Sequence, residues 1–163
     1  MRLDWREALA PVLIEARRVA VLGIGSPLNS DDAAGMLLID ELKERDLEEA
    51  QVLLIAGSSA PENFTGVIGD FGPDLLLAVD AARLGLEPGQ IVQLEGGELY
   101  GAEFSTHMLP FSVMLHYLRQ RGLTNVLLLG IEPKSTEFGF ELSQPVWLAV
   151  REIADFIAQA LKA

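Results

Sequence analysis

Short apolar runs alternate with amphipathic stretches along the chain, at the spacing of strands and helices in an α/β domain. The apolar runs predict strands at residues 19–23, 51–56, 75–80, 89–94 and 125–131. The amphipathic stretches predict helices at residues 32–45, 61–71, 108–120 and 144–162, with an additional N-terminal helix within residues 1–17. We expect a single three-layer domain over residues 1–163, in which a twisted, mainly parallel sheet of about five strands carries helices on both faces.

Two of these strands differ in character. Residues 75–80 are continuously apolar up to Asp80, which is typical of a central strand that is buried on both faces. Residues 89–94 alternate between polar and apolar positions and follow a turn at Glu87-Pro-Gly. We therefore expect the second segment to be an antiparallel strand at the edge of the sheet.

Composition narrows the possible environments and partners. The chain has no cysteine, so it contains no disulfide, thiolate metal site or cysteine nucleophile. Its formal net charge of −12 repels phosphate backbones, so we expect no nucleic-acid partner. The apolar runs are too short for membrane insertion, and residues 1–17 lack the pattern of a secretory signal. We expect a cytoplasmic protein.

Three separate stretches bring a metal-competent side chain to the predicted end of a strand or the start of a helix. The first strand leads through a Gly/Pro/Asn/Ser loop to the pair Asp31-Asp32, residues 75–80 end on Asp80, and His107 precedes the helix at 108–120. In open α/β sheets, residues just past the carboxyl ends of strands converge on one crevice. Two carboxylates and an imidazole gathered there suit a divalent metal or proton transfer.

Each of these residues also has a purely structural interpretation. Either member of the pair Asp31-Asp32 is suited to cap a helix, and one carboxylate is enough for that role. Asp80 is placed to cap the turn after its strand, and a histidine near a helix start such as His107 commonly makes a structural hydrogen bond. The second histidine, His116, lies within a predicted helix, where we expect a structural role.

The G-x-G at Gly23 and Gly25 does not predict a dinucleotide site. The third glycine of the dinucleotide fingerprint is missing, and Pro27 interrupts the turn where the phosphate-binding helix would begin. The two glycines are explained by a tight exit from the strand. A flavodoxin-like nucleotide or flavin binder is therefore disfavoured, and no G-x-S-x-G motif supports a serine hydrolase.

Taken in order, these segments resemble the hydrogenase maturation endopeptidases. The family motif G-x-G-N-x-L followed by an acidic pair is matched by Gly23-Ile-Gly-Ser-Pro-Leu-Asn-Ser-Asp31-Asp32. A strand ending in Asp-Ala is matched by Val79-Asp80-Ala81, and the S/T-x-H stretch before a helix is matched by Ser105-Thr106-His107. Agreement between several ordered motifs is far more specific than any single motif.

Further segments are similar to the branch of that family which serves formate-hydrogenlyase-type hydrogenases. They are Ser-Ala-Pro-Glu-Asn at 59–63, Gly-Leu-Glu-Pro-Gly-Gln at 85–90, Gly-Ile-Glu-Pro at 130–133 and Gln-Pro-Val at 144–146. The resemblance covers residues 18–160. The chain departs from the family pattern at Ser26, where the family has asparagine, and at residues 33–34, where Ala-Ala replaces Gly-x.

The resemblance implies an endopeptidase that removes the C-terminal extension of a nickel–iron hydrogenase large-subunit precursor after nickel insertion. It implies that Asp32, Asp80 and His107 bind the nickel, which the substrate supplies, although the same ligands accept other divalent metals. Asp31 is then left as the helix cap, and the general base stays unassigned between Asp32 and Asp80. The alternative is a non-proteolytic module that binds or delivers metal during hydrogenase assembly.

Overall fold

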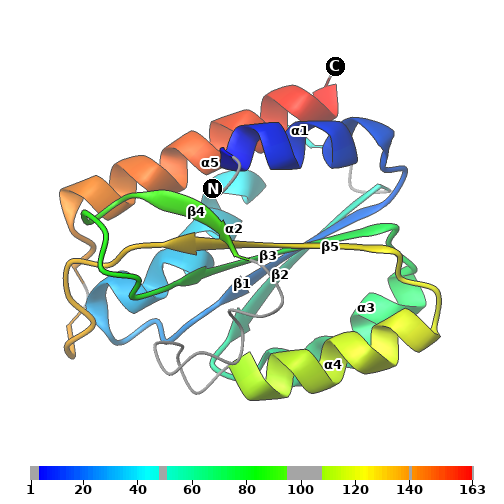
Figure 1. The fold of residues 1–163 in the computed structure, drawn as a ribbon, viewed down its shortest axis with the longest axis horizontal. Helices are drawn as coiled ribbons and strands as arrows, with labels where there is room; N and C mark the ends of the chain where they lie inside the picture. Colours follow the sequence, from blue (N-terminus) through cyan, green and yellow to red (C-terminus); the bar gives the residue numbers. More distant parts are fainter. Residues whose placement is uncertain (1–3, 48–50, 95–107, 140, 163) are drawn as a thin grey trace.

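The sheet that the sequence predicts is present in the computed structural model, which describes residues 4–47, 51–94, 108–139 and 141–162 (Figure 1). The strands of the described residues are β1 (Val19–Ile24), β2 (Val52–Ser58), β3 (Leu75–Ala81), β4 (Ile91–Leu94) and β5 (Asn125–Ile131). They lie in the order β2-β1-β3-β5-β4, and each neighbouring pair is parallel except β4 with β5. The predicted antiparallel edge strand is thus confirmed, and β3 is central and buried throughout.

Helices cover both faces of this sheet, as expected. They are α1 (Trp5–Glu15), α2 (Ala34–Lys43), α3 (Thr65–Phe71), α4 (Met108–Gln120) and α5 (Gln144–Lys162), with 3₁₀ turns η1 (Ser30–Ala33) and η2 (Pro61–Phe64). Figure 1 shows α1, α2 and α5 on one face and α3 and α4 on the other. No described helix is long and apolar enough to cross a membrane.

Alternating side chains of the strands divide the core into two layers. In β3, Leu75, Leu77 and Val79 pack with α1, α2 and α5, whereas Leu76 and Ala78 pack with α3 and α4. This alternation is the two-residue period of a strand that is buried on both sides. The additional N-terminal helix belongs to the first layer, because the Trp5 ring meets the Phe156 ring of α5 edge to face, with 5.1 Å between centroids.

Two glycines place the start of α2 directly against the sheet. A Cβ added at Gly23 would lie 2.1 Å from the carbonyl oxygen of Gly35, and a Cβ at Gly35 would lie 2.6 Å from backbone atoms of Ile24 and Val79. The first turn of α2 therefore rests on the backbones of β1 and β3 with no side chain between them. Gly23 lies inside β1, so the prediction that it permits the exit from the strand was wrong, and its role is to admit the helix.

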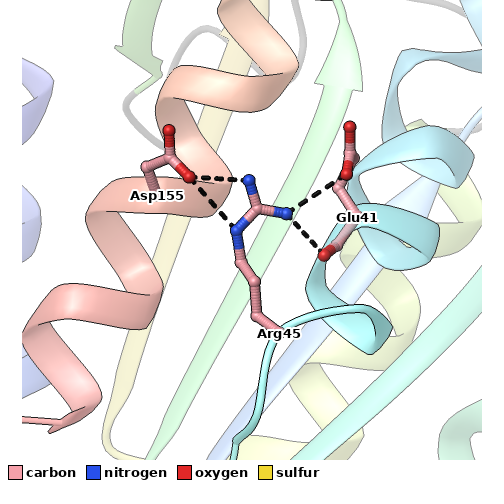
Figure 2. A network of polar contacts seen from close by, with 3 residues as sticks. All are labelled: Glu41, Arg45 and Asp155. Carbon is pink, nitrogen blue, oxygen red and sulfur yellow. Dashed lines mark hydrogen bonds and ion pairs between the residues drawn. The ribbon is translucent and has the colours of Figure 1, made fainter.

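An ion-pair network fixes the opposite end of α2 to α5 (Figure 2). The Arg45 guanidinium donates to Asp155 Oδ1 at 2.6 Å and 3.2 Å, and to the Glu41 carbonyl and Oε2 at 2.6 Å and 3.2 Å. Burial acts to lower the pKa of Arg45, but the bonds to Asp155 and Glu41 outweigh it and raise that pKa above its usual value. The helix that carries η1 at its start is thus held at both ends.

Candidate functional site

The loops that follow three neighbouring strands meet at the carboxyl edge of the sheet, on the left in Figure 1. Residues 25–33 follow β1, residues 82–90 follow β3 and residues 132–143 follow β5. Strands β1, β3 and β5 are adjacent and parallel, so their carboxyl ends point the same way. This is the edge at which open α/β sheets bind their ligands.

Asp80 lies within β3, opposite Gly130 of β5, and only 1% of its surface is exposed. Its side chain has the same parity as Leu76 and Ala78, so it faces the layer of α3 and α4. Its Oδ1 lies 3.4 Å from the position that a Cβ would occupy at Gly25. A carboxylate buried among apolar strands is an expensive placement unless charge or hydrogen bonds compensate for the lost water.

The backbone of Asp32 lies against the same glycine. A Cβ at Gly25 would lie 1.9 Å from the carbonyl oxygen of Asp32, and Gly25 has a φ of 134°, which favours glycine. The half-buried Asp32 carboxylate accepts a hydrogen bond from the Ser26 N–H through Oδ2 at 2.8 Å. The structure thus brings two of the three predicted ligand residues together at Gly25, because the Asp32 carbonyl oxygen and Asp80 Oδ1 both lie within 4 Å of the same Cβ position.

The third predicted ligand, His107, lies outside the described residues. The helix that follows it in the sequence, α4, begins at Met108 on the face of the sheet toward which Asp80 points (Figure 1). Within the part of the chain that is described, no group of three histidine, aspartate or glutamate side chains is close enough to hold a metal ion. The complete trio therefore stays a prediction.

Asp31 has a different role from the one that its position suggests. Its carboxylate is 1% exposed and accepts hydrogen bonds from the N–H groups of Lys134 (2.8 Å), Ser135 (3.3 Å) and Ser143 (2.7 Å) and from the Ser143 hydroxyl (2.8 Å). Neither η1 nor α2 has a side-chain cap. The prediction that Asp31 caps the helix was wrong, because the orphan amides that it satisfies belong to a distant loop.

Glu132 is a buried carboxylate that the sequence analysis did not single out. It follows β5 directly and is 5% exposed, and its Oε1 accepts hydrogen bonds from Leu84 N–H at 2.7 Å and Leu86 N–H at 2.9 Å. It thereby holds the loop after β3. The available signal was the same as for Asp80, namely an acidic residue at the end of an apolar run, within Gly-Ile-Glu-Pro at 130–133.

Comparisons with known proteins agree with this architecture. A family model described as hydrogenase maturation protease matches residues 36–160. The hydrogenase 3 maturation protease of Escherichia coli is 32% identical over 136 residues, which cover 82% of this chain and 84% of that protein. A putative hydrogenase maturation protease of Methanocaldococcus jannaschii is 29% identical over 139 residues, with 82% of each chain covered. The chain belongs to the hydrogenase maturation proteases.

Solved structures of hydrogenase maturation proteases share the fold. The crystal structure of the [NiFe] hydrogenase maturation protease HycI from Thermococcus kodakarensis superposes with a TM-score of 0.85 at 32% identity, covering 96% of this chain and 99% of that one. The solution structure of an endopeptidase HycI from Escherichia coli gives a TM-score of 0.75 at 28% identity, covering 87% and 90%. The family resemblance and the enzyme class, an endopeptidase, are therefore confirmed for this chain.

The residues matched by the family model include two of the three proposed ligands. Asp80 and His107 lie within residues 36–160, whereas Asp32 precedes that range. The assignment of Asp32 therefore stays a prediction from the resemblance of its acidic pair to the family motif, and the structure adds that its backbone carbonyl and the Asp80 carboxylate both lie close to Gly25.

Proposed function

We propose that this maturation protease removes the C-terminal extension of a nickel–iron hydrogenase large-subunit precursor once nickel has been inserted. The observation that supports the proposal is the buried Asp80 carboxylate at the carboxyl edge of the sheet, where Asp80 Oδ1 and the Asp32 carbonyl oxygen both lie close to Gly25. The relatives from Escherichia coli and Thermococcus kodakarensis are hydrogenase maturation proteases, which supports a hydrogenase as the substrate class.

Nickel enters this proposal as part of the substrate. Carboxylate oxygens from Asp32 and Asp80 and an imidazole nitrogen from His107 form a ligand set that suits nickel and also accepts zinc or manganese. A protease that binds an ion held by the precursor distinguishes nickel-loaded from nickel-free precursor without recognising a sequence motif. Recognition of the bound ion thereby restricts cleavage to precursor that has completed metal insertion.

The chemistry required is the hydrolysis of one peptide bond. A divalent ion bound at this edge supplies a Lewis acid for the scissile carbonyl or a template for the attacking water. The chain supplies a carboxylate as general base, from Asp32 or Asp80, whichever is not fully engaged by the ion. The hydrogen bond from Ser26 N–H orients the Asp32 carboxylate, while Asp80 is held by its place inside β3.

The experiment follows precursor mass with time, using wild-type enzyme and precursor with or without nickel. We expect loss of the C-terminal extension only from nickel-loaded precursor, and no cleavage by Asp32→Asn or His107→Ala. His116→Ala is the matched control, because His116 is the other histidine and lies exposed on α4 near Gln120. Cleavage of nickel-free precursor at the same rate would contradict ion recognition.

A different result would identify the alternative function. A metal-delivery module would change the nickel content of the precursor without shortening its chain. The mass of the shortened chain would then not appear. Wild-type cleavage rates in purified Asp32→Asn or His107→Ala would show that these residues do not carry the reaction.

A further inference from the structure

The loops after β1 and β5 are joined along their length. Ser30 N–H donates to the Gly139 carbonyl at 2.8 Å, Gly139 N–H donates to the Leu28 carbonyl at 2.8 Å, and the Ser30 hydroxyl donates to the Glu137 carbonyl at 2.7 Å. Asn29 and Gly139 form a parallel bridge. Residues 25–33 and the described residues 132–139 and 141–143 therefore form one hydrogen-bonded unit, which we call the loop pair.

Asp31 is the buried anchor of the loop pair. Its carboxylate accepts four hydrogen bonds, three from backbone amides and one from the Ser143 hydroxyl, while its own N–H donates to the Ser135 carbonyl at 3.1 Å. A carboxylate suits this position because every partner of its two oxygens is a donor. The contacts reach both ends of the second loop, from Lys134 to Ser143.

Asp32 is the next residue on the same 3₁₀ turn. Successive side chains of a 3₁₀ turn point roughly 120° apart, so Asp31 reaches the loop after β5 while Asp32 reaches Ser26. Fixing the Asp31 carboxylate thus fixes the rotation of the turn that carries Asp32. The backbone of Asp32 is also confined by its close approach to Gly25.

We propose that Asp31 is a positioning residue, whose carboxylate sets the placement of Asp32 relative to Asp80 through the loop pair. This inference rests on the proposed function, in which Asp32 contacts the ion of the substrate. Ligand groups must be held within about 0.5 Å of their productive positions, and side chains locked by surrounding hydrogen bonds achieve this. Asp31 itself touches neither ion nor peptide.

Asp31→Asn tests this role with almost no change in volume. One carboxylate oxygen becomes an NH₂ group that faces amide donors, so at least one hydrogen bond is replaced by a repulsive contact. We expect kcat on nickel-loaded precursor to fall by about tenfold or more and KM to rise by a smaller factor, since Asp32 also contacts the ion of the substrate and small misplacements of reacting groups have large effects on rate. Hydrogen exchange of amides in residues 25–33 should become faster.

Glu132→Gln is the matched control. Glu132 is also buried, also accepts from backbone amides and also holds a loop at the carboxyl edge, but that loop is 82–90 and not the loop pair. We expect it to lower thermal stability by a similar amount and to accelerate exchange in residues 82–90, while kcat stays at the wild-type value. Equal kcat losses in the two variants would reduce Asp31 to a general structural role and overturn the proposal.

Ser143→Ala is the milder second variant and keeps the test decisive if Asp31→Asn does not fold. It removes one hydroxyl donor to Asp31 and keeps the backbone amide bond. We expect a fall in kcat of about threefold with faster exchange in residues 25–33. Wild-type kcat and wild-type exchange in this variant would overturn the proposal.

Failure of the wild-type enzyme to cleave would instead contradict the proposed function. The exchange data would still report whether Asp31 orders the loop that carries Asp32.

Discussion

The aspartates at the two ends of β3 differ in their surroundings. Asp74 precedes the strand, is partly exposed, and accepts hydrogen bonds from Arg17 N–H at 2.9 Å and Arg18 N–H at 2.8 Å. Asp80 lies near the other end, is 1% exposed, and has its Oδ1 close to Gly25, as is the backbone carbonyl of Asp32. The first carboxylate satisfies the amides of the turn before β1, and this local task explains its presence.

The contrast shows that an acidic residue at a strand end is informative only at the proper edge of the sheet. Both residues flank the same apolar segment, and local sequence distinguishes them poorly. The parallel order of β1, β3 and β5 makes the carboxyl edge the place where loops converge. Asp80 lies at that edge, whereas Asp74 lies at the amino edge.

The strongest test of this comparison uses the variants Asp80→Asn and Asp74→Asn. We expect Asp80→Asn to lower the cleavage rate by about 10²–10⁴-fold, because the amide can act neither as an anionic ligand nor as a general base. Asp74→Asn should leave the rate unchanged. The measurement is the rate of shortening of nickel-loaded precursor, with circular dichroism to verify the fold of each variant. Similar rates for both variants would remove Asp80 from the site.

Gly25→Ala is expected to have the next largest effect. Its Cβ would overlap the Asp32 carbonyl at 1.9 Å, so the backbone of Gly25 or of Asp32 must move. We expect a loss of about 2–4 kcal/mol in the free energy of unfolding, from combined strain and overlap, and a large loss of cleavage.

Gly72→Ala provides the control for backbone strain alone. Gly72 has a φ of 67° at the end of α3, and nothing lies within 4 Å of its added Cβ. We expect a loss of about 1 kcal/mol with normal cleavage. Denaturant unfolding and cleavage rates measured on both variants separate the two effects, and normal cleavage by Gly25→Ala would show that the close approach is not needed.

The smallest expected effect concerns the pH dependence that Asp74 gives to stability. Partial burial acts to raise the pKa of Asp74, but its hydrogen bonds from the amides of Arg17 and Arg18, with the Arg17 charge, outweigh it and lower that pKa below the ordinary 3.8. A lowered folded-state pKa means stability that is present above the unfolded-state value and is lost as pH falls through the folded-state value.

Asp74→Asn should therefore be less stable than wild type by about 1 kcal/mol at pH 7, and the difference should shrink below about pH 4. Thermal unfolding at several pH values measures it. A difference that stays constant down to pH 2 would assign the effect to shape and not to charge.

The sequence predicted the elements well because their signals are local. Apolar runs and Gly/Pro breaks placed every strand of the described sheet, and the alternation at 89–94 identified the edge strand. The positions of strand ends also selected the pair Asp31-Asp32 and Asp80, and the structure brings the Asp32 backbone and the Asp80 carboxylate close to Gly25. These predictions needed only the periodicity of the chain and the geometry of parallel sheets, whereas the choice of Asp32 over Asp31 came from the family resemblance.

The role of Asp31 was not predictable in the same way. The hydrogen-bond donors to its carboxylate are 103 to 112 residues away in the sequence, so no local pattern indicates them. The same holds for Gly23, whose partner is the backbone of Gly35, and for Glu132, whose partners lie 46 and 48 residues earlier. Each of these roles depends on how finished elements pack, which periodicity does not encode.

The contact of α2 with the strands has a consequence for how this enzyme tolerates change. Gly23 and Gly35 let main chain touch main chain, so the separation of the first turn of α2 from β1 and β3 is set by van der Waals contact between backbone atoms and not by side-chain size. Substitutions that enlarge or shrink the apolar layers should displace the parts of the helices that lie far from this contact before they displace Asp32 and Asp80 at the carboxyl edge of the sheet. Relatives that differ in most of their interior residues can thus keep the same spacing between the two carboxylates.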